Sequence, residues 1–523
     1  MAKKQFKVTY TTLSSPDPEL HKLYDEAVQQ AKNDFGKTYP LFINGEERHA
    51  AETFEKRSPI NLDWVMGTFQ KGSKQDFNDA VAAAKAAFPA WSRRPWQERV
   101  DIVRKAADLI HERLFYLGAM MSMEIGKNRL EALGDLGETA DIYRYNCDAM
   151  EANNGFVFVN KQDDEHHRNR SVMKPYGVWA VIAPFNFPAA LAGGPASAAL
   201  VTGNTVVLKP ATDTPITAWF LTQCFRDAGV PDGAINFVTG SGRVAGEALL
   251  NNPDVAGITF TGSYDVGMHI LRTFSHSKYP RPVIAEMGGK NPTIISSKAD
   301  LEKAAMGVMR SAFGLQGQKC SACSRVYIHE DLKAPFMEKL VALTEKINVG
   351  DPTEKDNWMG PVANKSAYED YQKYVADLAE NGNIAYGGRV LEIEGRDGYY
   401  VAPTIVDDLP HDHRLWKEEM FLPIVTVTDF KELDDAMEKA NDVDYGLTAG
   451  FYSEDDDEKQ WFLDNIEAGV IYVNRLGGAT TGAWPGYQTF GGWKGSGSTG
   501  NNAFSHSYLQ QYMHEQSQTV VES

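Results

Sequence analysis

The sequence predicts an α/β protein that contains a doubly wound, parallel sheet. Short apolar runs between residues 177 and 286 alternate with segments of helical pattern. Parallel strands need crossover connections of a dozen or more residues, usually helices, so this alternation favours repeated β-α-β units. The chain also has 523 residues, which is too long for one hydrophobic core and predicts two or three domains.

The predicted elements follow in order along the chain. Residues 41–49 contain an Asn-Gly pair, which is typical of the turn of a β-hairpin. Residues 75–150 have a helical pattern of apolar residues, clearest over 79–88 and 99–110. Strands are then expected at 177–183, 205–208, 235–239, 257–261 and 283–286, with helices at 189–200, 214–228, 243–251 and 265–275.

A second alternation, from about residue 287 to 475, predicts another α/β domain. Two segments fit neither block: residues 151–171, which include a very polar run, and residues 500–523. Neither segment has an evident partner within the chain. We therefore expect both to take part in contacts between subunits.

Composition limits the classes of function. The net charge of −18 and the pI of about 5.2 disfavour binding to nucleic acid or to anionic lipid. Four cysteines cannot form a disulfide framework, and the first residues lack the apolar run of a signal peptide, so a cytoplasmic setting is expected. Residues 178–208 are uncharged and long enough to span a bilayer, but three prolines and a Gly-Gly pair interrupt them. We expect a buried strand, loop, helix and strand there.

Two cysteines, Cys320 and Cys323, stand three positions apart in a glycine-framed stretch, and three kinds of chemistry use such a pair. A structural zinc site needs four ligands, whereas the other two cysteines are single and distant. A redox dithiol follows a strand and opens a helix, whereas residues 304–313 before this pair are themselves helical in pattern. The third reading, one nucleophile with a packed neighbour, needs a base and a group that stabilises an oxyanion.

Candidates for both groups stand at the ends of predicted strands. Glu286 ends one strand before a Gly-Gly turn, where its carboxylate would face the crevice beyond the sheet. Asn186 follows another strand between two prolines, and its amide could donate to an oxyanion. Each residue alone is equally well explained as a surface glutamate or a turn asparagine. Their shared position at strand ends favours a catalytic role.

The same edge of the predicted sheet has features of a dinucleotide site. Residues 240–246 match the pattern G-x-G-x-x-A, although the acidic residue expected about 20 positions later is not evident. Gly262 and Ser263 open the next helix, whose N-terminal amides suit a pyrophosphate. Lys209 ends a strand nearby, where it suits a ribose or a phosphate. Together these features favour a dinucleotide.

Motifs along the whole chain resemble those of the aldehyde dehydrogenase superfamily. In order they are PFNFP, VVLKP, FTGS, EMGGK, GQKCSACSR, EEMFLP, YGLTAG and FGGWKGSG. The resemblance covers about residues 40 to 515. The branch it resembles most is that of the glutamate-semialdehyde (1-pyrroline-5-carboxylate) dehydrogenases, to which YPLFINGE, GQKCSACSR and TTGAWPGYQTFGG are similar.

The resemblance implies the fold of that superfamily and a division into domains. It implies a dinucleotide-binding domain over 1–150 and 172–285 and a catalytic domain over 286–475. Residues 151–171 and 476–523 would form a small β extension for oligomerisation, and the 476–492 loop would also line the substrate pocket. A homodimer or a higher homo-oligomer is therefore expected.

The resemblance also implies a role for each matching residue. Cys320 corresponds to the nucleophile, Glu286 to the general base and Asn186 to the oxyanion donor. The residues that match cofactor contacts are Ala183, Pro184, Lys209, Gly262, Ser263, Gly288, Glu419 and Phe421. The residues that match the substrate pocket are Glu138, Phe187, Lys319, Ser321, Gly482, Ala483 and Phe490. No metal ligand is implied, and Cys323 is expected to pack without a chemical role.

The chain departs from the family pattern at three places. Leu422 stands where a glycine is typical, and Trp484-Pro485 stands where the branch commonly has small residues. Thr212 stands where many relatives that prefer NAD have a glutamate for the ribose hydroxyls, and Asp213 follows it. We therefore expect NAD as the cofactor, with NADP tolerated.

The resemblance implies oxidation of an aldehyde to a carboxylate through a cysteine thiohemiacetal and a thioester. The expected substrate is L-glutamate γ-semialdehyde, which would place the enzyme in proline catabolism. Relatives that pass the acyl group to coenzyme A generally lack a glutamate at the position of Glu286, so its presence favours hydrolysis. The alternatives are an enzyme for another polar or short aliphatic aldehyde and a catalytically silent structural or binding protein on the same fold.

Overall fold

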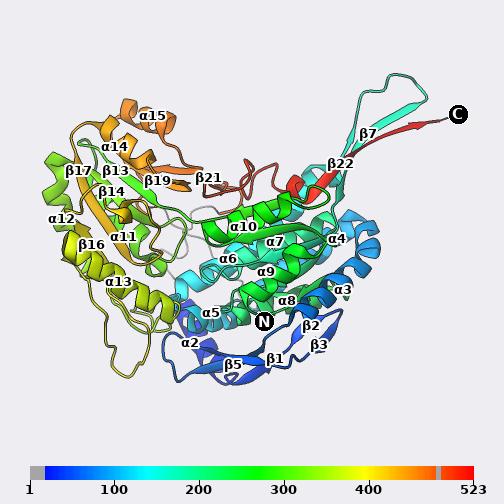
Figure 1. The fold of residues 1–523 in the computed structure, drawn as a ribbon, viewed down its shortest axis with the longest axis horizontal. Helices are drawn as coiled ribbons and strands as arrows, with labels where there is room; N and C mark the ends of the chain where they lie inside the picture. Colours follow the sequence, from blue (N-terminus) through cyan, green and yellow to red (C-terminus); the bar gives the residue numbers. More distant parts are fainter. Residues whose placement is uncertain (1–17, 479–483, 523) are drawn as a thin grey trace.

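The computed structural model describes residues 18–478 and 484–522, which form two lobes and a narrow extension (Figure 1). Each lobe contains one seven-stranded sheet with helices packed against it. Both sheets consist mainly of parallel strands connected by helices. The predicted α/β fold with doubly wound parallel sheets is therefore confirmed.

The first sheet has the order β12-β11-β8-β9-β10-β2-β3. Its strands are β12 (Val283–Glu286), β11 (Val255–Thr261), β8 (Val178–Ile182), β9 (Thr205–Lys209), β10 (Ile235–Phe237), β2 (Leu41–Ile43) and β3 (Glu46–Arg48). The strands from β12 to β10 are parallel, and the chain order reverses between β8 and β11. Such a reversal opens a crevice beyond the carboxyl ends of the strands, where ligands bind.

The helices between these strands are those that the alternation predicts. They are α7 (Ala190–Thr202), α8 (Pro215–Ala228), α9 (Gly242–Asn251) and α10 (Tyr264–Ser275). The uncharged stretch 178–208 forms β8, α7 and β9, as expected, and most of it is buried. Within the described part of the chain, no helix is long and apolar enough to cross a membrane. The Asn-Gly pair forms the β2–β3 turn, with a φ of 54° at Asn44 and 82° at Gly45.

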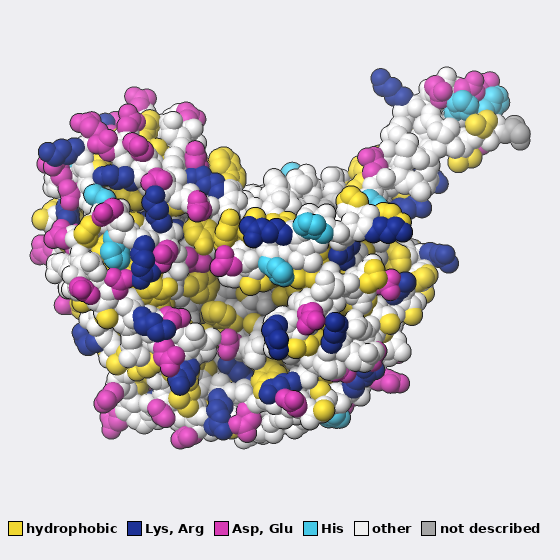
Figure 2. All heavy atoms as spheres, viewed as in Figure 1, with side chains coloured by type: hydrophobic (Ala, Val, Ile, Leu, Met, Phe, Trp, Pro, Cys, Tyr) yellow, Lys and Arg dark blue, Asp and Glu magenta, His cyan; other side chains and the backbone are white. Residues whose placement is uncertain are grey.

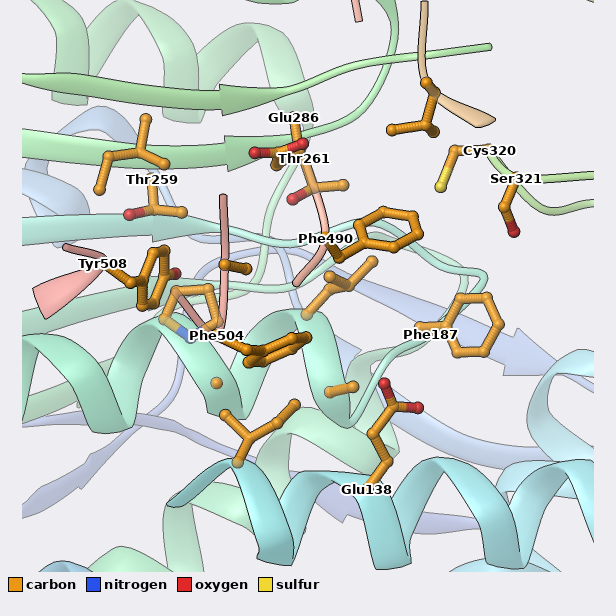
Figure 3. A pocket seen from close by; sticks show the side chains of 18 of the residues that line it. Glu138, Phe187, Thr259, Thr261, Glu286, Cys320, Ser321, Phe490, Phe504 and Tyr508 are labelled. Atoms are coloured by element: carbon orange, nitrogen blue, oxygen red, sulfur yellow. The ribbon is translucent and has the colours of Figure 1, made fainter. Parts of the chain in front are cut away.

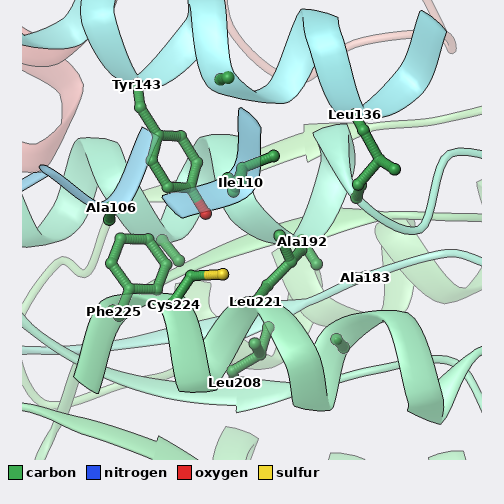
Figure 4. Packing of buried hydrophobic residues seen from close by; sticks show 14 of the residues in the cluster. Ala106, Ile110, Leu136, Tyr143, Ala183, Ala192, Leu208, Leu221, Cys224 and Phe225 are labelled. Atoms are coloured by element: carbon green, nitrogen blue, oxygen red, sulfur yellow. The ribbon is translucent and has the colours of Figure 1, made fainter. Parts of the chain in front are cut away.

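The N-terminal region packs as helices and a small sheet against the first lobe. The helices are α2 (Pro18–Lys32), α3 (Lys74–Arg93), α4 (Trp96–Glu112), α5 (Leu114–Ile125) and α6 (Arg129–Ala152), and the small sheet contains β1 (Lys37–Tyr39), β5 (Val65–Gln70) and β4 (Thr53–Arg57). Tyr143 of α6 stacks on Phe225 of α8 with ring centroids 4.9 Å apart, and Cys224 lies beside them (Figure 4). Close packing of this kind fixes the position of α6 against the sheet helices.

The second sheet has the order β15-β16-β17-β14-β13-β19-β20. Its strands are β13 (Asn291–Ile295), β14 (Cys323–His329), β15 (Asn383–Tyr386), β16 (Thr404–Asp407), β17 (Ile424–Phe430), β19 (Thr448–Tyr452) and β20 (Val470–Val473). The helices of this lobe are α11 (Leu301–Phe313), α12 (Glu330–Thr344), α13 (Lys365–Asn381), α14 (Leu433–Asn441) and α15 (Asp456–Asn465). Short elements complete the described chain: β18 (Tyr445–Gly446) pairs with β21 (Trp493–Lys494), and 3-10 turns span Asn154–Phe156, Gly314–Gly317, Arg414–Trp416 and Leu509–Tyr512.

The extension consists of β6 (Val157–Val159), β7 (His167–Pro175) and β22 (Met513–Val521) (Figure 1). β22 pairs antiparallel with β7 along its whole length, from Met513 opposite Pro175 to Val521 opposite His167. The two segments without an evident partner in the sequence are therefore partners of each other. The division into domains and the role of the extension in oligomerisation stay predictions.

A buried ion pair fixes the start of α7. The side chains of Lys127 and Asp135 are fully buried, with Nζ and Oδ2 2.8 Å apart. The other Asp135 oxygen accepts the backbone N–H of Ala190 at 2.9 Å, because the helix has no capping side chain at Ala189. Lys127 Nζ also lies 3.9 Å from the ring centre of Phe187. Removing one partner of such a pair typically costs about 3–5 kcal/mol, so the pair holds this turn firmly.

Candidate active site

One pocket brings together many of the residues that the sequence predicts for the site (Figure 3). Its lining includes Glu138, Phe187, Glu286, Cys320, Ser321 and Phe490 among the predicted residues, together with Ile142, Ala190, Leu191, Gly194, Pro195, Thr259, Thr261, Ile284, Met287, Leu447, Ala503, Phe504 and Tyr508. These residues come from both lobes, and Figure 2 shows apolar side chains gathered between the lobes. The pocket is thus a mainly apolar space with a thiol and two carboxyl groups in its wall.

Strand ends of the first sheet bring the predicted base and cofactor residues to one edge. In the ladder, Ile182 pairs with Lys209 on one side and with Phe260 on the other, and Thr261 pairs with Glu286. The residues directly after β8 and β11 are Ala183, Pro184, Gly262 and Ser263. The predicted meeting of these residues at one sheet edge is therefore confirmed, while their cofactor contacts stay predictions.

Cys320 lies on the loop between α11 and β14, at the amino end of the second sheet. Leu315 and Gln316 on this loop have positive φ values of 48° and 55°, a conformation that costs free energy for residues other than glycine. Gly317 follows with a φ of 65°, and a Cβ there would lie within 3 Å of the Leu422 carbonyl. The surrounding structure therefore determines the path of the loop.

Leu422, which replaces the usual glycine, is accommodated by the core of the second lobe. Its side chain is buried among the apolar residues between the sheet and its helices. Phe421 before it adopts a positive φ of 56°. Its ring centroid lies 5.7 Å from that of Phe185, with the two rings nearly perpendicular. The backbone thus takes the positive φ at Phe421, and the side chain of Leu422 packs in the core of the second lobe.

Burial favours the protonated forms of the reactive groups. The pKa of the Cys320 thiol is raised to about 12 by burial and by the nearby carboxylates of Glu419 and Glu286. Burial also raises the pKa of Glu286 to about 8, and its Oε2 has no hydrogen-bond partner in the described chain. A carboxyl group with such a pKa is suited to exchange a proton with a thiol or a water molecule near neutral pH.

The second cysteine of the pair belongs to the core. Cys323 is 2% exposed, and its Sγ lies 3.2 Å from Thr293 Oγ1. Burial raises the pKa of its thiol to about 11. The prediction that Cys323 packs is therefore confirmed.

Two described residues that were predicted for catalysis or substrate binding, Asn186 and Lys319, are not among those that line the pocket. Asn186 is buried in the turn between β8 and α7, next to Phe187. Lys319 is also buried, and its Nζ lies near Gly314, where the charge of Glu131 acts on it. The predicted residues Gly482 and Ala483 lie outside the described residues.

The N-terminus of α10 fits a pyrophosphate. No side-chain hydrogen bond caps this helix at Ser263, so its first N–H groups remain available. In contrast, Ser241 caps α9 by accepting the N–H of Val244 at 3.3 Å. A Cβ at Gly262 would lie within 3 Å of the Phe260 ring, so any other residue there would have to displace this ring. Of the two glycine-opened helices, α10 is the better candidate.

Lys209 stands at the same edge with one acidic neighbour. Its side chain is buried, and burial lowers its pKa to about 8 although Asp213 opposes the shift. Asp213 itself accepts a hydrogen bond from Asn364 Nδ2 at 2.9 Å. The carboxylate beside Thr212 is thus engaged with the second lobe.

Glu419 contacts the turn that follows β12. Its Oε1 accepts the backbone N–H of Gly289 at 2.8 Å, and burial raises its pKa to about 7. A Cβ at Gly288 would lie within 3 Å of this carboxyl group. The predicted cofactor residues Gly288 and Glu419 are therefore brought together.

The pocket also contains residues that the sequence did not indicate. Thr259 and Thr261 alternate along β11, a pattern that places both side chains on one face of the sheet. Tyr508 comes from the C-terminal region, and its hydroxyl lies 2.8 Å from that of Tyr512, which in turn lies 3.1 Å from Thr259 Oγ1. The two-residue repeat of side-chain direction along β11 could have indicated that both threonines face the same side of the sheet. No signal in the sequence places Tyr508 at this sheet.

A model of the aldehyde dehydrogenase family matches residues 46–518. This chain belongs to the aldehyde dehydrogenase family. It is 38% identical over 507 residues to a 1-pyrroline-5-carboxylate dehydrogenase of a Geobacillus species, covering 96% of both chains. It also resembles a Thermus 1-pyrroline-5-carboxylate dehydrogenase solved with bound NAD, with a TM-score of 0.92, 32% identity and 100% of both chains covered. The family and fold that the motifs indicate are confirmed.

Replacing each cysteine of the pair separates the reactive thiol of this aldehyde dehydrogenase from the packed one. Cys320→Ala should abolish NADH formation with any aldehyde, because it removes the only one of the two thiols that lines the pocket. Cys323→Ala should keep most of the rate and lower the free energy of unfolding by about 1 kcal/mol, through the lost packing. NADH absorbance and denaturant unfolding measure the two effects. Equal loss of activity in two folded variants would contradict the assignment.

Proposed function

We propose that this aldehyde dehydrogenase oxidises L-glutamate γ-semialdehyde to L-glutamate with NAD, as a step of proline catabolism. The observation that carries the proposal is a single pocket whose wall holds the Cys320 thiol and the Glu286 carboxyl group, with Ser321, Phe187 and Phe490 around the remaining space. Similarity to 1-pyrroline-5-carboxylate dehydrogenases over 96% of the chain supports this choice of substrate.

The first step is attack of the Cys320 sulfur on the aldehyde carbon. Because burial holds the proton on the thiol, attack requires a base, and the ionised form of Glu286 accepts that proton. The oxyanion that forms on the aldehyde oxygen accepts hydrogen bonds from the backbone N–H of Cys320 and the side-chain amide of Asn186. When bound at the edge with α10, NAD supplies the acceptor for the hydride that leaves this carbon.

The second step is hydrolysis of the thioester on Cys320. Glu286, once it has released its proton, accepts one from a water molecule as the water oxygen attacks the thioester carbon. The carbon–sulfur bond then breaks to give the carboxylic acid and the Cys320 thiolate. The proton of the acid returns to this thiolate, which leaves the carboxylate product and the resting thiol. The apolar wall around Glu286 restricts the access of other water to this carbon.

The amino-acid end of the substrate requires polar partners in an otherwise apolar pocket. Ser321 offers a hydroxyl, and the family resemblance assigns further donors to Gly482 and Ala483. Phe187 and Phe490 are suited to hold the aliphatic chain between them. An apolar aldehyde would leave buried donors unpaired, at about 1–3 kcal/mol each.

Trp484 does not narrow this pocket in the described structure. It is 5% exposed, and its indole N–H donates to Asp141 Oδ2 on α6 at 2.8 Å. It is also not among the residues that line the pocket. The bulky residue in the substrate loop is therefore compatible with a semialdehyde substrate.

The alternatives are another polar or short aliphatic aldehyde and a catalytically silent protein on the same fold. The raised pKa of Glu286 and the pocket position of Cys320 favour an active enzyme. We also propose a homodimer or a higher homo-oligomer, because the extension exposes Val159, Val520 and Val521. Light scattering on the chain with and without residues 506–523 measures this assembly.

The pH dependence of turnover should report Glu286. Its pKa of about 8 means that the basic form increases as the pH rises through 8, so a rate limited by thioester hydrolysis should rise between pH 6 and 9 and then level off. Glu286→Gln should slow hydrolysis by at least about a hundredfold and let an acyl-enzyme accumulate, as mass spectrometry would show. Full turnover by this variant would remove Glu286 from the mechanism.

A panel of aldehydes tests the substrate. Glutamate semialdehyde should have a kcat/KM at least about tenfold above those of propanal, hexanal and benzaldehyde, which corresponds to about 1.4 kcal/mol of transition-state binding. Initial rates of NADH formation give the comparison. A smaller gap would leave the general aldehyde dehydrogenase activity and reject this substrate.

The ratio of kcat/KM with NAD to that with NADP tests the cofactor. We expect NAD to be preferred and NADP to be used, because residue 212 is a threonine and Asp213 is engaged with Asn364. Discrimination against NADP should therefore stay below about a thousandfold, or about 4 kcal/mol. A larger ratio would indicate an acidic group at the ribose 2′ position.

A further inference from the structure

Asn291, the first residue of β13, holds the loop that carries Cys320. It is 2% exposed, and its Nδ2 donates to the carbonyl of Cys320 at 2.7 Å and to that of Ala322 at 2.8 Å. Its Oδ1 accepts the backbone N–H of Thr448 at 2.9 Å. Backbone carbonyls only accept and a backbone N–H only donates, so these partners fix the orientation of the amide. All three hydrogen bonds of Asn291 are thus directed at backbone.

The Cys320 carbonyl belongs to the same planar peptide as the Ser321 N–H. In a trans peptide the C=O and the N–H point in opposite directions, so a partner that fixes one fixes the other. The backbone N–H groups of Cys320 and Ser321 act on the Cys320 sulfur and lower the pKa of its thiol against the effect of burial. Asn291 therefore binds the carbonyl side of this peptide, and the Ser321 N–H points to the other side.

The approach of this carbonyl depends on a glycine. A Cβ on Gly289 would lie within 3 Å of both the Cys320 carbonyl oxygen and Asn291 Oδ1. No side chain larger than hydrogen fits at this position without moving the loop. The Gly-Gly turn after Glu286 therefore gives the Cys320 peptide access to Asn291.

We propose that Asn291 is a positioning residue that orients the Cys320–Ser321 peptide so that the Ser321 N–H donates to the Cys320 sulfur. The effect is on the thiolate: a hydrogen bond from Ser321 stabilises the charged form and so increases the fraction of Cys320 that is able to attack. The inference goes beyond the proposed function, because it concerns the nucleophile before any aldehyde or cofactor binds.

Thr448 provides a matched control in the same loop. Its Oγ1 donates to the Ser321 carbonyl at 3.1 Å, which is the next peptide along the chain. The N–H of that peptide belongs to Ala322 and donates to the Lys319 carbonyl at 3.1 Å, not to the sulfur. Thr448→Val therefore removes one buried hydrogen bond from the loop and leaves the Ser321 N–H in place.

Alkylation of the enzyme by iodoacetamide, without aldehyde or cofactor, tests the proposal. Below the pKa of a thiol, its alkylation rate is proportional to the thiolate fraction, so a pKa shift of about one unit changes the rate about tenfold. Between pH 6 and 9, Asn291→Ala should be alkylated at Cys320 about tenfold more slowly than the unmodified enzyme, and Thr448→Val at nearly the unmodified rate. Mass spectrometry of the Cys320 peptide follows the reaction.

The direction of the effect separates positioning from a general loosening of the loop. A loosened loop would expose Cys320 and speed alkylation, whereas loss of the Ser321 donor slows it. Asn291→Ser keeps one donor without adding charge and should give an intermediate rate. It replaces Asn291→Ala in the comparison if circular dichroism shows that the alanine variant does not fold. An unchanged or faster rate in the Asn291 variants, or an equal slowing in Thr448→Val, would overturn the proposal.

Discussion

The short connection between β12 and β13 is the constraint on which the site depends. Glu286 ends the last strand of the first sheet and Asn291 begins the first strand of the second, so only residues 287–290 separate the two sheets along the chain. A Cβ on Gly289 in this connection would overlap the Cys320 carbonyl, and one on Gly288 would displace the Glu419 carboxyl group. Ser496 adds a hydrogen bond from its hydroxyl to the Gly288 carbonyl at 2.6 Å. The base of one lobe and the nucleophile loop of the other are therefore held at a nearly fixed separation.

Burial gives the acidic groups of the pocket one common property. The pKa values of Cys320, Glu286 and Glu138 are all raised, because removing a charge from water costs more than the few nearby hydrogen bonds recover. A pocket whose groups are largely uncharged at rest costs less to bury than one with three anions. The same condition lets small changes in hydrogen bonding to the sulfur alter the fraction of reactive thiolate.

The sequence was sufficient for features that follow from local pattern. The alternation of apolar runs predicted the parallel sheet, and the end of one such run placed Glu286 at the edge of that sheet. The lack of further metal ligands near Cys320 and Cys323 disfavoured a zinc site, and the resemblance to aldehyde dehydrogenase motifs implied which of the two thiols is reactive. Each of these inferences depends on the period of a strand or on a short segment of the chain.

Features set by distant parts of the chain could not be predicted. Tyr508 reaches the pocket because Tyr512 meets Thr259, which is more than two hundred residues away in the sequence. The position of the Lys319 side chain depends on the loop before it, where Leu315 and Gln316 adopt positive φ values. The conformational preferences of these two residue types do not indicate such a backbone. The packing of Leu422 could not be predicted either, because it depends on the shape of the core around this side chain.

The pairing of β22 with β7 also determines when the molecule can be completed. The two strands are separated by more than three hundred residues, so the extension cannot form until residues 513–521 have been synthesised. The first sheet and its helices can fold earlier, because all of its strands precede residue 287. Residues 508–521 thus complete both the extension and the Tyr508 side of the pocket, so a nascent chain has its nucleophile and base before it has a complete pocket wall.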